Sequence, residues 1–89
     1  SKNDAFTIIE NFNLIKMNID NNNKMLQIKS KVYGFLDIED EMYYYLSKIE
    51  LNNGNKILAV QYLELSLEKT NKKQLIKRIK ILKEKINEK

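Results

Sequence analysis

The fold is decided by residues 41–71, EMYYYLSKIELNNGNKILAVQYLELSLEKTN. On both sides of the NNGN turn, residues 42–51 and 56–67 carry apolar side chains at helical spacing and contain no proline. Gly54 can adopt the left-handed conformation that ends a helix, and Asn55 is a good cap for the helix that follows. The stretch therefore predicts two amphipathic helices joined by a tight turn.

Large and small side chains stand at fixed positions in this predicted hairpin. The first helix has an aromatic residue, then leucine followed by a small residue, and the turn has glycine. The second helix has alanine one turn in, a bulky apolar residue, and a small residue followed by leucine. These residues are Tyr43, Leu46, Ser47, Gly54, Ala59, Leu63, Ser66 and Leu67. The pattern resembles the tetratricopeptide repeat (TPR), with departures at Glu50, Leu63 and Asn71. The resemblance implies that Tyr43, Leu46, Ala59, Leu63 and Leu67 pack together inside the hairpin.

Residues 4–36 predict an earlier, degenerate hairpin. Apolar residues spaced four, three and four apart predict a helix over 4–19, and the DNNN sequence at 20–23 predicts a turn. A second helix is expected from about Lys24 to Leu36. Segment 12–26 shares several identical residues with 44–58, which indicates a repeat offset of 32 residues.

Residues 72–88 predict a strongly amphipathic last helix. Its apolar seam is formed by Leu75, Ile79, Leu82 and Ile86, again spaced four, three and four apart. Residues 72–89 contain eight basic and two acidic residues, a net charge of +6, whereas residues 1–71 contain eight basic and ten acidic residues, a net charge of −2. The basic character is therefore local to this helix, which resembles the polar capping helix of repeat arrays.

Together these segments predict one all-α domain, a right-handed stack of five helices. The expected architecture is a TPR-like stack of two antiparallel helical hairpins, 4–36 and 37–70, plus a C-terminal capping helix at 72–88. Asp37 is expected to cap the first helix of the second hairpin. A domain of 89 residues has a marginal core unless its helices stack efficiently.

The composition argues against catalysis. The chain has no cysteine, histidine or tryptophan, and it contains no glycine-rich phosphate loop. Residues 39–41 are three successive acids, but adjacent positions on a helix point in different directions and do not form a cation site. We therefore expect no catalytic residue, no bound cofactor, no metal and no small-molecule substrate. No apolar run approaches the roughly 20 residues needed to cross a bilayer.

The resemblance to TPR proteins implies a non-catalytic protein-protein interaction module that binds a partner protein or peptide through its concave face and acts within a larger assembly. In that family the first helix of each hairpin lines the groove. The corresponding residues are Glu41, Tyr44, Lys48, Leu51 and Asn52, joined by Phe12 and Lys16 from the first hairpin. Tyr44 is expected at the surface, because Tyr43 and Leu46 fill the core positions. Aromatic anchors beside cations suit a peptide with apolar and acidic side chains.

Two other kinds of contact stay open. The basic C-terminal helix could bind nucleic acid or an anionic surface electrostatically, although its single arginine, Arg78, and many lysines give little basis for reading bases. Two copies of the chain could also pair through the seam Leu75, Ile79, Leu82 and Ile86, if the preceding hairpin does not bury it.

Overall fold

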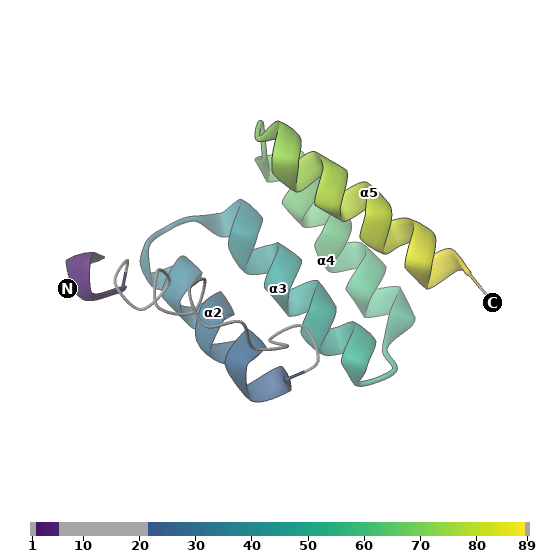
Figure 1. Cartoon of the computed structure of the whole chain (residues 1–89), viewed down its shortest axis with the longest axis horizontal. Coiled ribbons are helices and arrows are strands. Elements are labelled where there is room, and N and C mark those ends of the chain that lie inside the picture. The colour runs from purple at the N-terminus through teal and green to yellow at the C-terminus, as the bar shows by residue number, and fades with distance from the viewer. Residues whose placement is uncertain (1, 6–21, 89) are drawn as a thin grey trace.

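The computed structural model describes residues 2–5 and 22–88, and Figure 1 shows their arrangement. Residues 2–5 are helical, and four helices follow: α2 (Asn23–Phe35), α3 (Glu39–Asn52), α4 (Lys56–Lys69) and α5 (Lys73–Asn87). The described residues contain no strand, so the all-α prediction is confirmed. Of the predicted helix over 4–19, only residues 4–5 are described, and they are helical; residues 6–19 and the first half of the turn at 20–23 lie outside the described residues.

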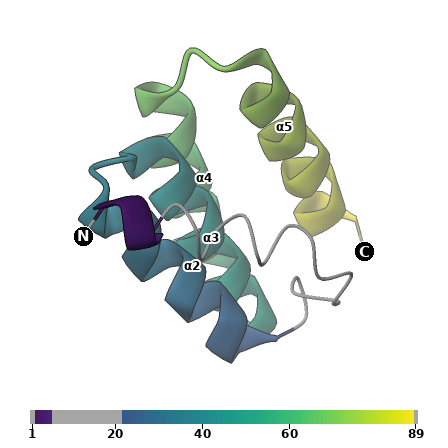
Figure 2. The same cartoon turned by 60° about the vertical axis from the view of Figure 1, so that its left-hand side comes forward.

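The helices α2 to α5 lie side by side in the order of the chain, and neighbours run antiparallel (Figure 1). The α3 helix packs closely against both α2 and α4, and α5 packs mainly against α4. Contact between α3 and α5 is slight, and the turned view in Figure 2 shows α5 set apart from α2 and α3. The last helix therefore extends the row rather than closing it into a bundle.

Two helices end in the same left-handed turn. At the end of α3, Gly54 has a φ of 84°, and the N–H of Asn55 donates to the carbonyl of Glu50 at 2.8 Å. At the end of α2, Asp37 has a φ of 58°, and the N–H of Ile38 donates to the carbonyl of Tyr33 at 2.9 Å. Both patterns are Schellman motifs, which satisfy the last carbonyls of a helix. The predicted role of Gly54 is confirmed.

The N-cap predicted for α3 is wrong, and the N-cap predicted for α4 is confirmed in its position but not in its side-chain hydrogen bond. Because Asp37 is used to end α2, Ile38 occupies the cap position of α3 and makes no side-chain cap bond. Asn55 stands at the cap position of α4, but its side-chain amide donates to a carboxylate oxygen of Glu50 at 3.0 Å. Asn22 does act as a cap, since its side-chain oxygen accepts from the backbone N–H groups of Lys24 and Met25.

The main core joins all four helices. Its fully buried apolar members are Leu26, Ala59, Leu63, Leu75 and Ile79. Two small residues, Ser47 and Ser66, are also fully buried and let α3 and α4 approach closely, and Ser66 Oγ donates to the carbonyl of Asp40 at 2.7 Å. Burial of these serine hydroxyls costs little because both are hydrogen-bonded.

The interior of the hairpin differs from the expectation at two positions. Ala59 and Leu63 are fully buried, as expected, and Leu46 packs half-buried against the core. Leu67, however, is 36% exposed. Tyr43 is half-buried and stacks on Tyr62 at the edge of the hairpin, with ring centroids 6.0 Å apart.

The α5 seam is buried within the single chain. Leu75, Ile79, Leu82 and Ile86 all belong to the main core. The possibility that these four residues pair two copies depended on the seam being left uncovered, and the seam is covered by the preceding helices. The lysines of α5 remain on its solvent side, where Lys73, Lys77 and Lys80 are exposed.

Candidate functional site

A groove lies between α3 and α5. It encloses about 360 Å³ and is lined by Tyr44, Tyr45 and Lys48 from α3 and by Arg78, Ile81, Leu82 and Lys85 from α5. The groove exists because α5 packs mainly on α4, so that few backbone positions of α5 come close to α3. Three of the seven lining residues are cations and the other four are apolar or aromatic. A surface of this kind offers both charge and apolar contact.

Tyr44 lines the groove on the α3 side. The structure places this residue in the core with only 5% of its surface exposed, contrary to the expectation of a surface anchor. The Lys48 ammonium lies 5.2 Å from the ring centroid, and the Arg78 guanidinium lies 4.9 Å from it. Both distances fall within the range of a cation–π interaction, so the ring helps to hold the two cations at the groove.

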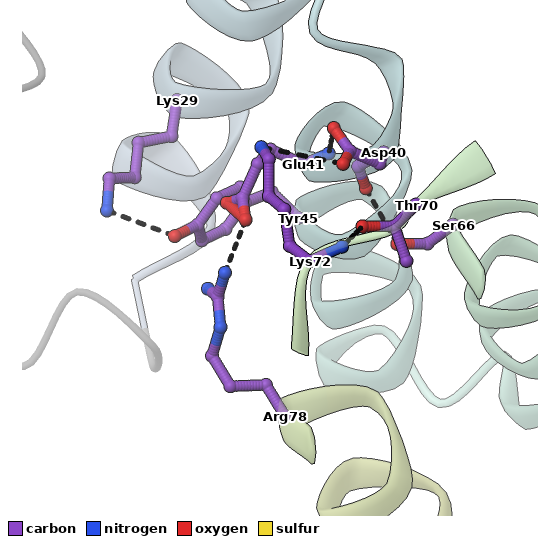
Figure 3. Close-up of polar contacts among 8 residues, drawn as sticks. All are labelled: Lys29, Asp40, Glu41, Tyr45, Ser66, Thr70, Lys72 and Arg78. Carbon is purple, nitrogen blue, oxygen red and sulfur yellow. Dashed lines mark hydrogen bonds and ion pairs between the residues drawn. The ribbon is translucent and has the colours of Figure 1, made fainter. Parts of the chain in front are cut away.

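A partly buried ion pair ties α3 to α5 beside the groove. Arg78 donates a hydrogen bond to Glu41 (Figure 3). The side chain of Glu41 is only 8% exposed, whereas that of Arg78 is 39% exposed. Burial alone would lower the pKa of Arg78, but the carboxylate of Glu41 outweighs this effect and the pKa is raised. Glu41 therefore stabilises the position of Arg78 instead of facing a partner directly.

The second aromatic residue of the groove, Tyr45, connects it to α2. Its ring stacks on Tyr33 with centroids 5.6 Å apart and meets Tyr44 edge-on at 5.4 Å. The ammonium of Lys29 donates to the Tyr45 hydroxyl at 3.2 Å (Figure 3). These three contacts fix the position of the Tyr45 side chain at the groove.

The same packing predicts a loss of stability at alkaline pH. Burial raises the pKa of the Tyr33 phenol above its ordinary value of 10.0, and Tyr45 and Glu41 raise it further. The unfolded chain therefore releases this proton first. The contribution of Tyr33 is fully present below the unfolded pKa and is lost as the pH rises from there towards the folded pKa. We expect the melting temperature of Tyr33→Phe to decline less above pH 10.0 than that of the wild type. Melting curves over a pH series would test this, and parallel declines would contradict it.

The α5 wall presents its residues in a regular row. Arg78, Ile81 and Lys85 are three and four residues apart and so lie on one flank of the helix. The two cations are separated by about 10 Å along the helix axis. Ile81 lies between them and is 46% exposed. The row is thus cation, apolar side chain, cation.

A second hollow lies at the start of α3, where the acids are already paired with lysines. Glu39 contacts Lys69 at 3.0 Å, and Asp40 contacts Lys72 at 3.4 Å. The hydrogen bond from Lys69 to Glu39 raises the pKa of that lysine. These pairs hold the α4–α5 connection against the start of α3, so we assign the acids at 39–40 a structural role.

Only some of the partner-binding residues predicted from the sequence lie at the groove between α3 and α5. Tyr44 and Lys48 line the groove, and Glu41 supports it through Arg78. Leu51 packs against the core, and the amide of Asn52 donates to Asn23 on α2 at 2.9 Å, so neither belongs to the lining. The other two predicted residues, Phe12 and Lys16, lie outside the described residues.

Sequence reasoning missed the contribution of α5. Arg78, Ile81 and Lys85 complete the groove. Two signals could have indicated them. Arg78 is the only arginine of the chain, and Ile81 is an isoleucine off the buried seam of its helix.

The described part of the chain shows neither a metal-binding cluster nor a membrane-spanning helix. No three side chains of the metal-ligating acidic, histidine or cysteine types come together among residues 2–5 and 22–88. Within the same ranges, no helix combines the length and the apolar character needed to cross a bilayer. The groove between α3 and α5 is therefore the feature that we consider as the functional site.

Comparison with known proteins found no match to this chain among family models, curated proteins or solved structures.

Proposed function

We propose that the chain is a non-catalytic protein-protein interaction module that binds a partner protein or peptide in the groove between α3 and α5. The main support is the composition of that groove, where aromatic and aliphatic side chains lie beside Lys48, Arg78 and Lys85. Arginine is one of the side chains most often found at the energetic centre of protein interfaces, and the exposed Ile81 lies beside Arg78. The resemblance of residues 41–71 to a TPR supports the same proposal, since in that family the first helix of each hairpin, here α3, lines the concave face.

The partner that fits this groove is an acidic segment with an apolar side chain. The exposed Ile81 offers apolar contact, and Arg78 and Lys85 flank it on the same face of α5. Carboxylates placed on either side of an apolar residue would meet these cations. Complementary charges of this kind speed association and select among partners more than they raise affinity.

Two matched charge reversals on α5 would test whether the partner binds in the groove. Lys85→Glu changes a residue of the groove, whereas Lys80→Glu makes the same change on the exposed side of the helix, outside the lining. We expect Lys85→Glu to weaken partner binding about tenfold or more and Lys80→Glu to change it little. The measurement is a pull-down from the native source, followed by calorimetry with the partner that is identified.

Ile81→Ala supplies an independent test of apolar contact. The side chain is already partly exposed, so its truncation should leave the fold intact and reduce partner binding. Far-UV circular dichroism would verify that the variant is folded. Partner binding that is insensitive to both Lys85→Glu and Ile81→Ala would exclude the groove.

The basic face of α5 supports a second candidate, electrostatic binding of nucleic acid or another anionic surface. Lys73, Lys77 and Lys80 are exposed there. Binding of this kind would fall steeply between about 50 and 200 mM salt. It would also be weakened equally by Lys80→Glu and Lys85→Glu, whereas the groove predicts that these two variants differ.

A further inference from the structure

The N-terminal half of α4 carries an exposed apolar surface away from the groove. Ile57 is 80% exposed, more than any other large apolar residue described. It stands between two hollows. One encloses about 380 Å³ and is lined by Lys56, Ile57, Val60, Gln61, Glu64, Ile86 and Asn87. The other encloses about 630 Å³ and extends over the turn before α4. None of the residues lining the first hollow lines the α3–α5 groove.

The charge of this surface changes from positive to negative along α4. Lys56 lies at its start, and Glu64 and Glu68 lie further along α4, and all three are exposed. Ile57 and Val60 lie between the opposite charges. A uniformly acidic partner would be repelled by Glu64, and a uniformly basic one by Lys56. The complementary surface is therefore one with the same charges in the reverse order.

We propose that this α4 surface binds a second copy of the chain, with the two α4 helices antiparallel around a two-fold axis at the level of Val60. In this register Lys56 lies level with Glu64 of the second copy. Ile57 lies between Val60 and Glu64 of that copy and so enters the hollow beside Ile86. A protruding side chain next to a hollow on the same face is what a self-complementary interface requires. Each contact forms twice, so its effect on association is doubled in free energy.

The first test is the mass of the full chain as a function of concentration. Sedimentation equilibrium over roughly 1 µM to 1 mM should show a reversible monomer–dimer equilibrium. Ile57→Glu should weaken association about tenfold or more, because it places a carboxylate against Val60 and near Glu64 of the second copy. The variant should fold normally, since position 57 is exposed and an acid in the first turn of a helix is favourable. Ile81→Glu, on an exposed residue of the other surface, serves as the control and should dimerise as the wild type does.

The second test is a charge exchange that verifies the register. Lys56→Glu and Glu64→Lys should each weaken the dimer, because each places like charges opposite each other twice. The double variant restores opposite charges and should recover the dimer to near its wild-type strength. A mass that stays monomeric up to about 1 mM would overturn the proposal. So would a dimer that is unaffected by Ile57→Glu, or a double variant weaker than both single variants. Partner binding through the groove is expected to survive Ile57→Glu, so the two proposals can fail separately.

Discussion

Leu63→Ala is expected to lower the free energy of unfolding by about 2–5 kcal/mol. Leu63 is fully buried on α4, the helix that packs against both α3 and α5. Truncating the side chain removes apolar contacts and leaves a cavity where three helices must stay in register. A domain of this size has a total stability of about 4–13 kcal/mol, so the change removes a large part of it. Urea unfolding followed by far-UV circular dichroism would measure the difference.

Leu65→Ala is the matched control for this prediction. It makes the same chemical change two residues along the same helix, where the side chain is 36% exposed. The intrinsic helix propensity changes equally in both variants, so only the loss of buried contacts differs. We expect Leu65→Ala to cost less than about 1 kcal/mol. Similar losses in the two variants would contradict the assigned core of α4.

Arg78→Met is expected to cost about 2 kcal/mol of stability, since it leaves the buried carboxylate of Glu41 without its partner. The value is set below the cost for a fully buried pair, because Arg78 is partly exposed and its charge is already screened by solvent. Glu41→Gln should cost less, because the guanidinium left behind can still be hydrated. We thus expect the stability loss to be larger for Arg78→Met than for Glu41→Gln, because Glu41 is the less exposed of the two partners.

The double variant Glu41→Gln with Arg78→Met separates the ion pair from the packing around it. It removes both charges, so it should be more stable than Arg78→Met alone. Urea unfolding of the wild type, the two single variants and the double variant gives the coupling energy of the pair directly. Equal and small losses in both single variants, below about 0.5 kcal/mol, would show that the pair contributes no more than a surface ion pair.

The positions of the helices could be predicted from local sequence. The expected helix from Lys24 to Leu36 is observed as Asn23–Phe35, and the helix expected over 72–88 is observed as Lys73–Asn87. Both have apolar residues at helical spacing, and both are bounded by polar residues. The end of α3 at Gly54 could also be predicted locally, since glycine adopts a positive φ without strain.

The end of α2 was harder to predict than the end of α3. Asp37 adopts the left-handed conformation that Gly54 adopts in the next turn, although aspartate is also one of the best N-cap residues. The sequence permits either role. Here Ile38 and Tyr33 pack in one small cluster with Leu36, so the apolar contact across the turn favours the role of Asp37 in ending α2.

The burial of Tyr44 could not be predicted from its own helix. Residues 43–45 are three successive tyrosines, which offer similar apolar area in different directions. Which of them is buried depends on the position of neighbouring helices. Tyr45 packs on Tyr33 of α2, and Tyr44 is covered with the help of Arg78 from α5. The groove residues of α5 were missed for the same reason, because their role depends on how far α5 lies from α3.

By itself, the sequence determined that the described part of this chain is helical, where the helices α2 to α5 begin and end to within a few residues, and which stripe of α5 is apolar. These are local properties, set by side-chain spacing and by the conformational freedom of residues such as Gly54. Only the tertiary structure decided that Tyr44 is buried, that Glu41 pairs with Arg78 across two helices, and that Ile57 is left exposed. Contacts between helices depend on their relative distance and rotation, and residue spacing within one helix does not specify either quantity.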